Sequence, residues 1–199
     1  MWVNLIASQS AHTQPRQKLP LLTLIATLNL RLARKQTDET QRQRHLDEAA
    51  QFINEADRIH NQYEPTFVVK GNLYLLTRKV DEAARSFNMV LEKRPNCIPA
   101  LLGRAKIQYH LQQYKAALKT YQDALKYSHG RFSAVEIRLG IAQCFAQLKM
   151  YHEAKIALKR CIDTVRDHDK REKDIFYLFV FIFLESCAQL NSVNHVSHN

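Results

Sequence analysis

A set of small residues recurs along this sequence at a nearly fixed step, and no other feature constrains the fold as much. Ala83, Ala117 and Ala154 form one such series, and Gly71, Ala105 and Ala142 form a second with the same two steps. Self-similarity at a period of about 20 to 50 residues is typical of proteins built by stacking one structural unit. We therefore expect a repeat architecture.

Each copy of the pattern is predicted to be a pair of antiparallel helices. Apolar residues recur every three or four positions, which is the spacing of one helix face. In two copies this face comprises Val80, Ala83, Ala84, Phe87, Val90 and Leu91, and Tyr114, Ala117, Leu118, Tyr121, Ala124 and Leu125. Pro65 and Pro99 mark helix starts, because proline is tolerated in a first turn but breaks a helix interior. The sequence therefore predicts an all-α chain.

Small and aromatic residues at fixed points of each copy are predicted to pack the helices together. A small side chain lets two helices approach closely, and an aromatic ring fills the space beyond it. The residues assigned to this repeat packing are Gly71, Tyr74, Ala83, Phe87, Ala105, Ala117, Tyr121, Ala142, Phe145 and Ala154.

The pattern resembles the tetratricopeptide repeat, a helix hairpin of about 34 residues. One copy carries that motif's aromatic, glycine, alanine and proline residues as Phe67, Gly71, Tyr74, Ala83, Phe87 and Pro95. The next copy departs from the motif with Gln108, where an aromatic residue is usual. The resemblance implies an α-solenoid of antiparallel helix hairpins. The alternative is a helical bundle in which the spacing arises by chance.

The chain is expected to divide into four parts. These are a flexible N-terminal segment at 1–18, an early helix pair with a polar insertion at 19–63, three tetratricopeptide repeats at 64–166, and a charged and apolar tail at 167–199. The apolar run at 175–184 is too short to span a membrane, because a spanning helix needs about 17 to 25 residues. The run is interpreted as a buried helix or strand, an interfacial segment, or sequence foreign to the native fold, and a membrane is not expected as a partner.

Positive charge is concentrated in the repeats. Residues 61–166 hold 18 Lys and Arg against 8 Asp and Glu, a net charge of +10. Such a region favours acidic partners, either nucleic acid or acidic protein segments. The alternative is a solvated helix face, because Lys and Arg are good helix formers. No aromatic platform accompanies the charge, so nucleic acid is expected to make only a weak contact.

Signals for catalysis, cofactors and metals are nearly absent. The four cysteines, Cys97, Cys144, Cys161 and Cys187, show neither a CxxC pair nor zinc spacing. His195 and His198 form an HxxH pair, which we interpret as a chance pair. The four glycines make no nucleotide-binding loop. We expect neither an enzyme nor a metal, cofactor or small-molecule substrate.

The first helix of each hairpin is predicted to line a concave face that binds a protein partner. The residues expected to be exposed there are Val68, Asn72, Leu75, Leu102, Lys106, Tyr109, Leu139 and Gln143. This mostly apolar set suits an extended or helical partner segment. Repeats that clamp a chaperone's terminal carboxylate carry Lys and Asn at two of these positions, and only Asn72 fits that pattern. The alternative is that these residues pack against a neighbouring helix.

Three longer sequence segments resemble the tetratricopeptide scaffold subunits of the RNA polymerase II-associated factor (Paf) complex. They are IPALLGRA (98–105), YKAAL (114–118) and EIRLGIAQCF (136–145), within a match that covers about residues 19–165. The resemblance implies a nuclear scaffold that holds the other subunits to RNA polymerase II and supports transcription elongation and histone modification. The alternatives are a generic tetratricopeptide adaptor for another assembly and a basic helical repeat that binds RNA.

Overall fold

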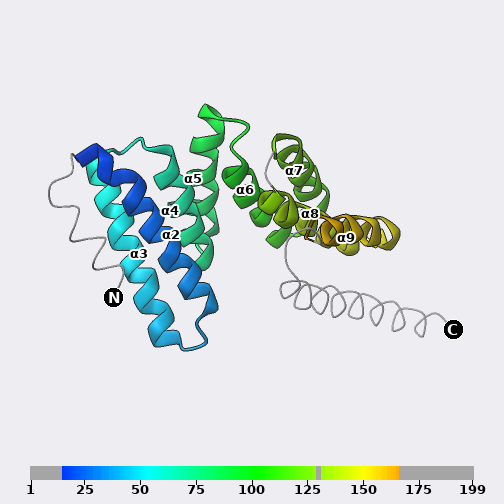
Figure 1. Cartoon of the computed structure of the whole chain (residues 1–199), viewed down its shortest axis with the longest axis horizontal. Helices are drawn as coiled ribbons and strands as arrows, with labels where there is room; N and C mark the ends of the chain where they lie inside the picture. The colour runs from blue at the N-terminus through cyan, green and yellow to red at the C-terminus, as the bar shows by residue number, and fades with distance from the viewer. Residues whose placement is uncertain (1–14, 129–130, 166–199) are drawn as a thin grey trace. The chain divides into compact units, whose positions relative to one another are not determined.

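The computed structural model describes residues 15–128 and 131–165, and within these ranges the regular elements are helices with no strand among them (Figure 1). The elements are η2 (Pro15–Lys18), α2 (Leu19–Lys35), α3 (Glu39–Ile59), α4 (Glu64–Leu76), α5 (Val80–Lys93), α6 (Ile98–His110), α7 (Tyr114–Tyr127), α8 (Arg131–Gln147) and α9 (Tyr151–Val165). The all-α fold class predicted from the sequence is confirmed.

The chain forms two compact units, Met1–Ile107 and Gln108–Asn199. The expectations for residues 1–14 and 167–199, including the apolar run and the HxxH pair, lie outside the described residues. The four-part division of the chain stays a prediction.

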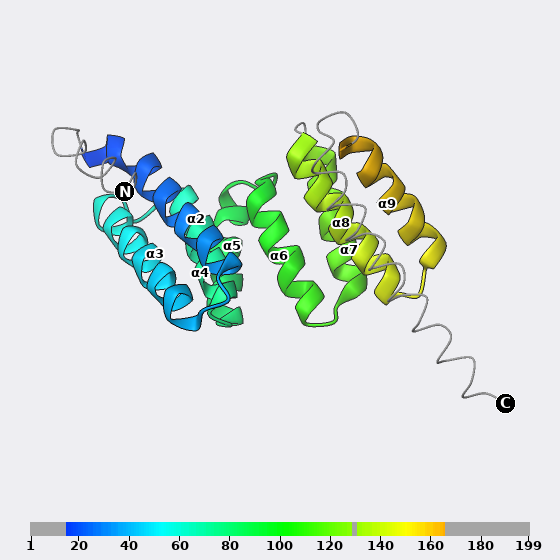
Figure 2. The same ribbon diagram turned by 60° about the horizontal axis from the view of Figure 1, so that its bottom comes forward.

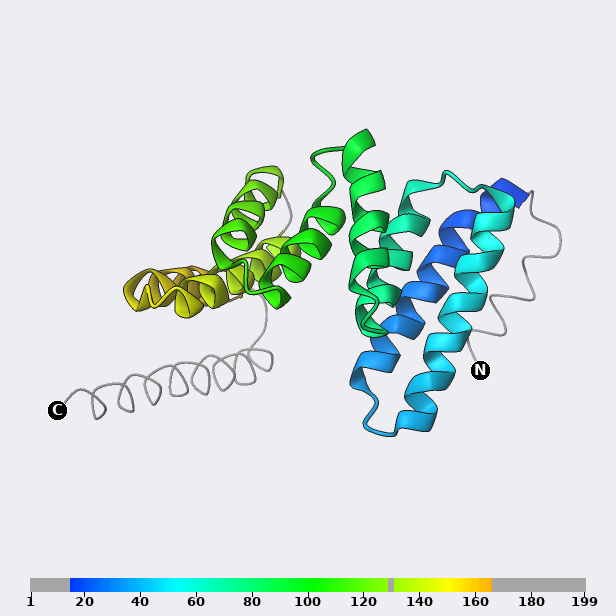
Figure 3. The same cartoon turned by 180° about the vertical axis from the view of Figure 1, so that it is seen from behind.

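In the first unit, α2 and α3 form a long hairpin, drawn in blue and cyan in Figure 1, whose short connection is visible from behind in Figure 3. Its core joins Ala26, Leu30 and Ala33 of α2 to Leu46, Ala49 and Ile53 of α3 and to Val69 of α4. The second hairpin pairs α4 with α5, and α4 also packs against both helices of the first hairpin. In the second unit, α8 packs against both α7 and α9 (Figure 2).

The polar run at 37–44 was expected to be an insertion before a helix, and the structure corrects this. Helix α3 begins at Glu39, and the side chain of Asp38 caps it by accepting a hydrogen bond from the Thr40 backbone N–H at 3.0 Å. Glu, Gln and Arg have high helix propensity, so these polar residues extend the helix without an apolar face to guide them. The prolines behave as predicted, with Pro65 and Pro99 in the first turns of α4 and α6.

Three turns between paired helices share one backbone conformation. Arg78, Gln112 and Lys149 adopt positive φ angles of 60°, 59° and 61°. In each turn the next backbone N–H donates to a carbonyl five residues earlier, for example from Lys79 to Tyr74 at 2.8 Å. A left-handed residue with this bond is the Schellman motif, which satisfies the last carbonyls of a helix. These turns recur at the repeat step, so they reverse the chain in the same way each time.

Glycines let aromatic rings fill the space between helices. The Phe87 ring of α5 lies against Gly71 of α4 on one side and Gly103 of α6 on the other, and Phe87 is fully buried. In the second unit, the Tyr121 ring of α7 lies against Gly140 of α8. The sequence reasoning did not single out Gly103 and Gly140. Their separation equals the step from Ala105 to Ala142, and this equality was the signal for them.

The residues assigned to repeat packing are mostly buried. Those that are buried are Gly71, Ala83, Phe87, Ala105, Ala117, Tyr121, Ala142 and Ala154. Tyr74 and Phe145 are half-buried. The regular step therefore places small and aromatic side chains in the interior, where close helix packing needs them.

Candidate protein-binding groove

A mostly apolar groove of about 470 Å³ opens in the first unit. We call it the α2–α4 groove. It is lined by Pro20, Thr23, Leu24 and Thr27 from α2, Tyr63, Glu64, Pro65, Val68 and Val69 at and before the start of α4, Val90 and Arg94 at the end of α5, and Cys97 and Pro99 at the start of α6. The first helices of the hairpins supply most of this lining.

The threonine hydroxyl groups in the groove are already engaged within α2. Thr23 Oγ1 donates to the backbone carbonyls of Leu19 and Pro20, at 3.1 and 2.9 Å. Thr27 Oγ1 donates to the carbonyl of Thr23 at 2.7 Å. Because these donors are satisfied locally, the groove offers a partner mainly apolar surface.

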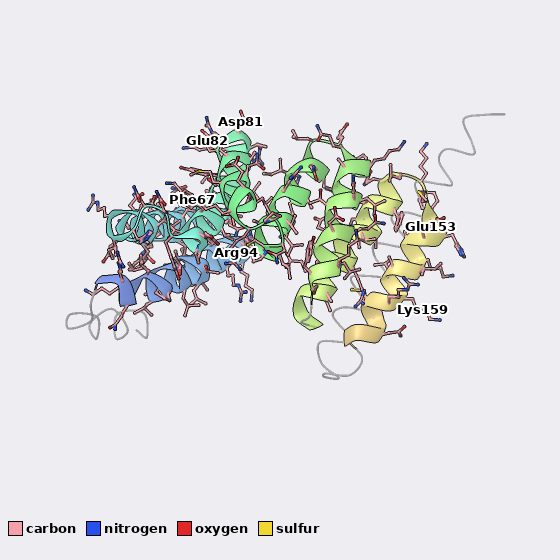
Figure 4. The ribbon with its side chains drawn as sticks, turned by 90° about the horizontal axis from the view of Figure 1, so that it is seen from above. Phe67, Asp81, Glu82, Arg94, Glu153 and Lys159 are labelled. Atoms are coloured by element: carbon pink, nitrogen blue, oxygen red, sulfur yellow. The ribbon has the colours of Figure 1, made fainter. Side chains whose placement is uncertain are left out.

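One ion pair stands at the edge of the groove. Arg94 Nη1 lies 3.1 Å from Glu64 Oε2, joining the end of α5 to the start of α4. Figure 4 labels Arg94 directly after α5, with Asp81 and Glu82 at the start of that helix. The Arg94 side chain is 60% exposed, so solvent screens the pair and it contributes little to stability. A partner's carboxylate can therefore compete for Arg94 at low energetic cost.

An exposed leucine row continues along α2 from the groove. Leu24, Leu28 and Leu32 are 55%, 43% and 43% exposed and lie one helical turn apart. Leu24 also lines the groove, so the row and the groove form one apolar surface. Contiguous exposed apolar surface rimmed by polar groups is typical of sites that bind other proteins.

Of the residues predicted to bind a partner, only Val68 lines the α2–α4 groove. Six of the other residues predicted to bind a partner are half-buried, namely Asn72, Leu75, Lys106, Tyr109, Leu139 and Gln143. The Tyr109 ring packs edge-on against Tyr114, with ring centroids 5.4 Å apart. Whether these residues contact a partner stays a prediction.

Leu102 was expected to be exposed, and this expectation is wrong. Its exposed fraction is 8%. Helix α6 buries every residue from 100 to 103, and successive side chains over such a run point around a full turn of a helix. A helix covered in this way has neighbours on more than one side, so Leu102 presents little surface to a partner.

Sequence reasoning missed the contribution of α2 to the groove. Counting back one repeat step from Val68 reaches Arg34, at the end of α2, whereas Leu24 and Thr27 line the groove. Helix α2 has 17 residues against 13 in α4, so the repeat step does not hold between these two first helices. The spacing of the exposed leucines, one helical turn apart, was the signal available in the sequence.

Two of the described thiols, Cys144 and Cys161, are poorly suited to chemistry. Burial raises the pKa of Cys144 to about 11 and, against a smaller opposing effect of Arg138, the pKa of Cys161 to about 11. Both thiols are therefore protonated near neutral pH, and a protonated thiol is a weak nucleophile and metal ligand. Among residues 15–128 and 131–165, no group of three or more His, Cys, Asp or Glu side chains is placed to hold a metal ion. None of the helices in these ranges is both long and apolar enough to cross a membrane.

Two segments match tetratricopeptide repeat families, at residues 99–128 and 135–164. The chain is 28% identical over 152 residues to "Protein CTR9 homolog" of Arabidopsis thaliana, covering 76% of this chain and 14% of that protein. It is 29% identical over 120 residues to "RNA polymerase-associated protein CTR9" of Caenorhabditis elegans, covering 58% of this chain and 10% of that protein. The chain thus spans about a seventh or less of the length of these relatives.

The fold is also similar to that of a solved tetratricopeptide repeat protein from Parabacteroides merdae. The TM-score is 0.57 at 20% identity, covering 96% of this chain and 68% of that chain. At this identity the similarity concerns the fold alone, and it agrees with the predicted α-solenoid class. The repeat period, the helix hairpins and these similarities show that the chain contains tetratricopeptide repeats and that its sequence resembles part of CTR9.

Proposed function

We propose that this chain is a protein–protein interaction scaffold of the RNA polymerase II-associated (Paf) complex. The sequence similarity to CTR9 proteins carries the proposal, since one of them is named as RNA polymerase-associated. In this role the chain acts in the nucleus without catalysing a reaction, and its partners are other subunits of the complex and RNA polymerase II. It supports transcription elongation and the histone modification that accompanies it.

We further propose that the α2–α4 groove takes an apolar segment of one such partner. Three observations support this. The groove is mostly apolar, the hydroxyls of Thr23 and Thr27 are engaged within α2, and Leu24 links the groove to the exposed leucine row. An apolar groove beside a helix suits a partner helix or extended strand that buries a few anchor side chains.

Affinity purification from native cells tests both proposals. The tagged chain, a Leu24→Glu variant and a Leu111→Glu variant are purified in parallel, and the co-purifying proteins are quantified by mass spectrometry. Leu111 is the matched control because it is 54% exposed, against 55% for Leu24, and does not line the groove. A charge at Leu24 has to be desolvated when a partner covers the groove, so we expect at least a tenfold loss of the bound subunit, equivalent to about 1.4 kcal/mol or more.

The outcomes separate the two proposals. Recovery of elongation-complex subunits and polymerase with the unmodified chain and with Leu111→Glu, but not with Leu24→Glu, supports both. Equal recovery with all three chains contradicts the groove and leaves the scaffold role intact. Recovery of chaperones alone contradicts the scaffold role, and a reproducible set of unrelated partners favours an adaptor for another assembly. Circular dichroism of both variants confirms that the helices persist.

A further inference from the structure

The outward face of α7 carries a row of three lysines. Lys115, Lys119 and Lys126, the lysine row, are all exposed, whereas the buried residues of this helix are Ala117, Thr120, Tyr121 and Ala124. At about 100° per residue the three lysines lie within about 40° of one another, opposite the buried side. At a rise of about 1.5 Å per residue the row is about 17 Å long.

The equivalent positions of the other hairpins have no such row. Counting by the repeat steps gives Asp47, Gln51 and Arg58 on α3, Asp81, Arg85 and Glu92 on α5, and His152, Ile156 and Asp163 on α9, all of them exposed. Lys159 and Glu153, labelled on α9 in Figure 4, further mix the charges of that helix. Since three hairpins fold without lysines at these positions, the fold itself does not require the lysine row.

The charge of the row is only partly neutralised. Lys126 Nζ lies 2.8 Å from Asp123 Oδ1, and this hydrogen bond and charge raise the pKa of Lys126. Within the part of the chain that the structure describes, Lys115 and Lys119 make no ion pair with a carboxylate. Asp123 is the only acidic residue of α7. Two to three uncompensated positive charges therefore face solvent along one helix.

The composition of this face favours nucleic acid over a protein partner. Protein interfaces are depleted of lysine at their centres and enriched in aromatic and apolar anchors. The exposed residues between the lysines, Ala116 and Gln122, offer no such anchor. Lysine ammonium groups act as point charges that neutralise phosphates. We propose that the lysine row binds the phosphate backbone of nucleic acid without reading its sequence.

Salt dependence tests this inference, which does not depend on the proposed scaffold role. The full chain is titrated into a fluorescein-labelled 20-base-pair DNA duplex and, separately, a labelled single-stranded RNA, and anisotropy is recorded between about 50 and 200 mM salt. Each phosphate contact contributes about −0.9 to the slope of log K against log salt for duplex DNA and about −0.7 for single strands. Whichever of the two is bound shows whether duplex or single-stranded backbone fits the row.

Two double variants carry the same loss of charge. Lys115→Gln with Lys119→Gln removes two members of the lysine row, and Lys79→Gln with Lys93→Gln removes two exposed lysines of the first unit. We expect the first pair to make the slope less steep by about 1.8 on duplex DNA or about 1.4 on single-stranded RNA, and the second pair to change it by much less. An equal effect of both pairs, or no binding of either nucleic acid at the lowest salt, overturns the proposal. A labelled poly-glutamate peptide is titrated in the same way. Tighter binding of this peptide than of both nucleic acids, lost in the Lys115→Gln with Lys119→Gln variant, also overturns the proposal, because the partner is then an acidic protein.

Discussion

Replacing Gly103 by alanine should destabilise the first unit, although alanine is the better helix former. A β-carbon at Gly103 would lie 2.5 Å from the Cε1 and Cε2 atoms of Phe87 and closer still to Cζ. Real β-carbons essentially never approach ring atoms to within 3.0 Å. The ring has little room to retreat, because the β-carbon position of Gly71 lies 2.6 to 3.0 Å from it on the other side. Helix α6 therefore has to shift away from α5.

The size of the effect follows from two opposing contributions. Overpacking a well-packed core costs about 1 to 3 kcal/mol, and a fully buried ring held from both sides places this site at the upper end. Replacing glycine by alanine inside a helix gains about 1 kcal/mol of helix propensity. We therefore expect Gly103→Ala to lower the free energy of unfolding by about 2 kcal/mol.

Urea unfolding followed by circular dichroism measures this change, and a double-mutant cycle with Phe87→Leu identifies its cause. Phe87→Leu removes the ring atoms that the alanine methyl would meet, so Gly103→Ala should cost much less in that background. Asn88→Ala, at an exposed position of α5, is the control for helix propensity and should be neutral or slightly stabilising. Stabilisation by Gly103→Ala, or an equal cost with and without the Phe87 ring, would refute the packing argument.

Three further predictions concern the cap of α3 and the thiols. Asp38→Ala removes the side chain that accepts the Thr40 N–H, and should lower the free energy of unfolding by about 1 kcal/mol, whereas Asp38→Ser should retain most of it in the same urea titration. Because the folded-state pKa values of Cys144 and Cys161 are raised to about 11, the folded state holds their protons more tightly than the unfolded chain. Stability should be unaffected below about pH 8.5 and fall as the pH rises from there towards 11, and Cys144→Ala with Cys161→Ala should flatten this fall. At pH 8, iodoacetamide should modify Cys97 before Cys144 or Cys161, as identified by mass spectrometry of the labelled peptides, and equal rates would contradict the protection.

Helix positions could be predicted well because their signals are local. Pro65 and Pro99 mark the starts of α4 and α6, since a missing N–H is tolerated only in the first turn. The helical structure of the polar run at the start of α3 could not be predicted in this way, because the run has no periodic apolar residues. Its helix depends on the Asp38 cap and on helix propensity. Periodicity thus identifies helices that bury a face and overlooks turns that remain in water.

The sequence by itself determined the repeat architecture of this protein. Small and aromatic residues that recur at a fixed step require units that pack in the same way each time. The contact of the Phe87 ring with Gly71 and the equivalent packing of the Tyr121 ring follow from this step. The lysine row was also present in the sequence, since α7 shows the same helical period as every helix.

Only the tertiary structure decided which surfaces remain open. The α2–α4 groove joins Pro20 to Pro99, which lie far apart in the sequence, and no local pattern links them. Leu102 has the same side chain as Leu24, yet one is 8% and the other 55% exposed. The physical reason is that exposure depends on which neighbours cover a helix face, and that is a property of the packed hairpins rather than of any one segment.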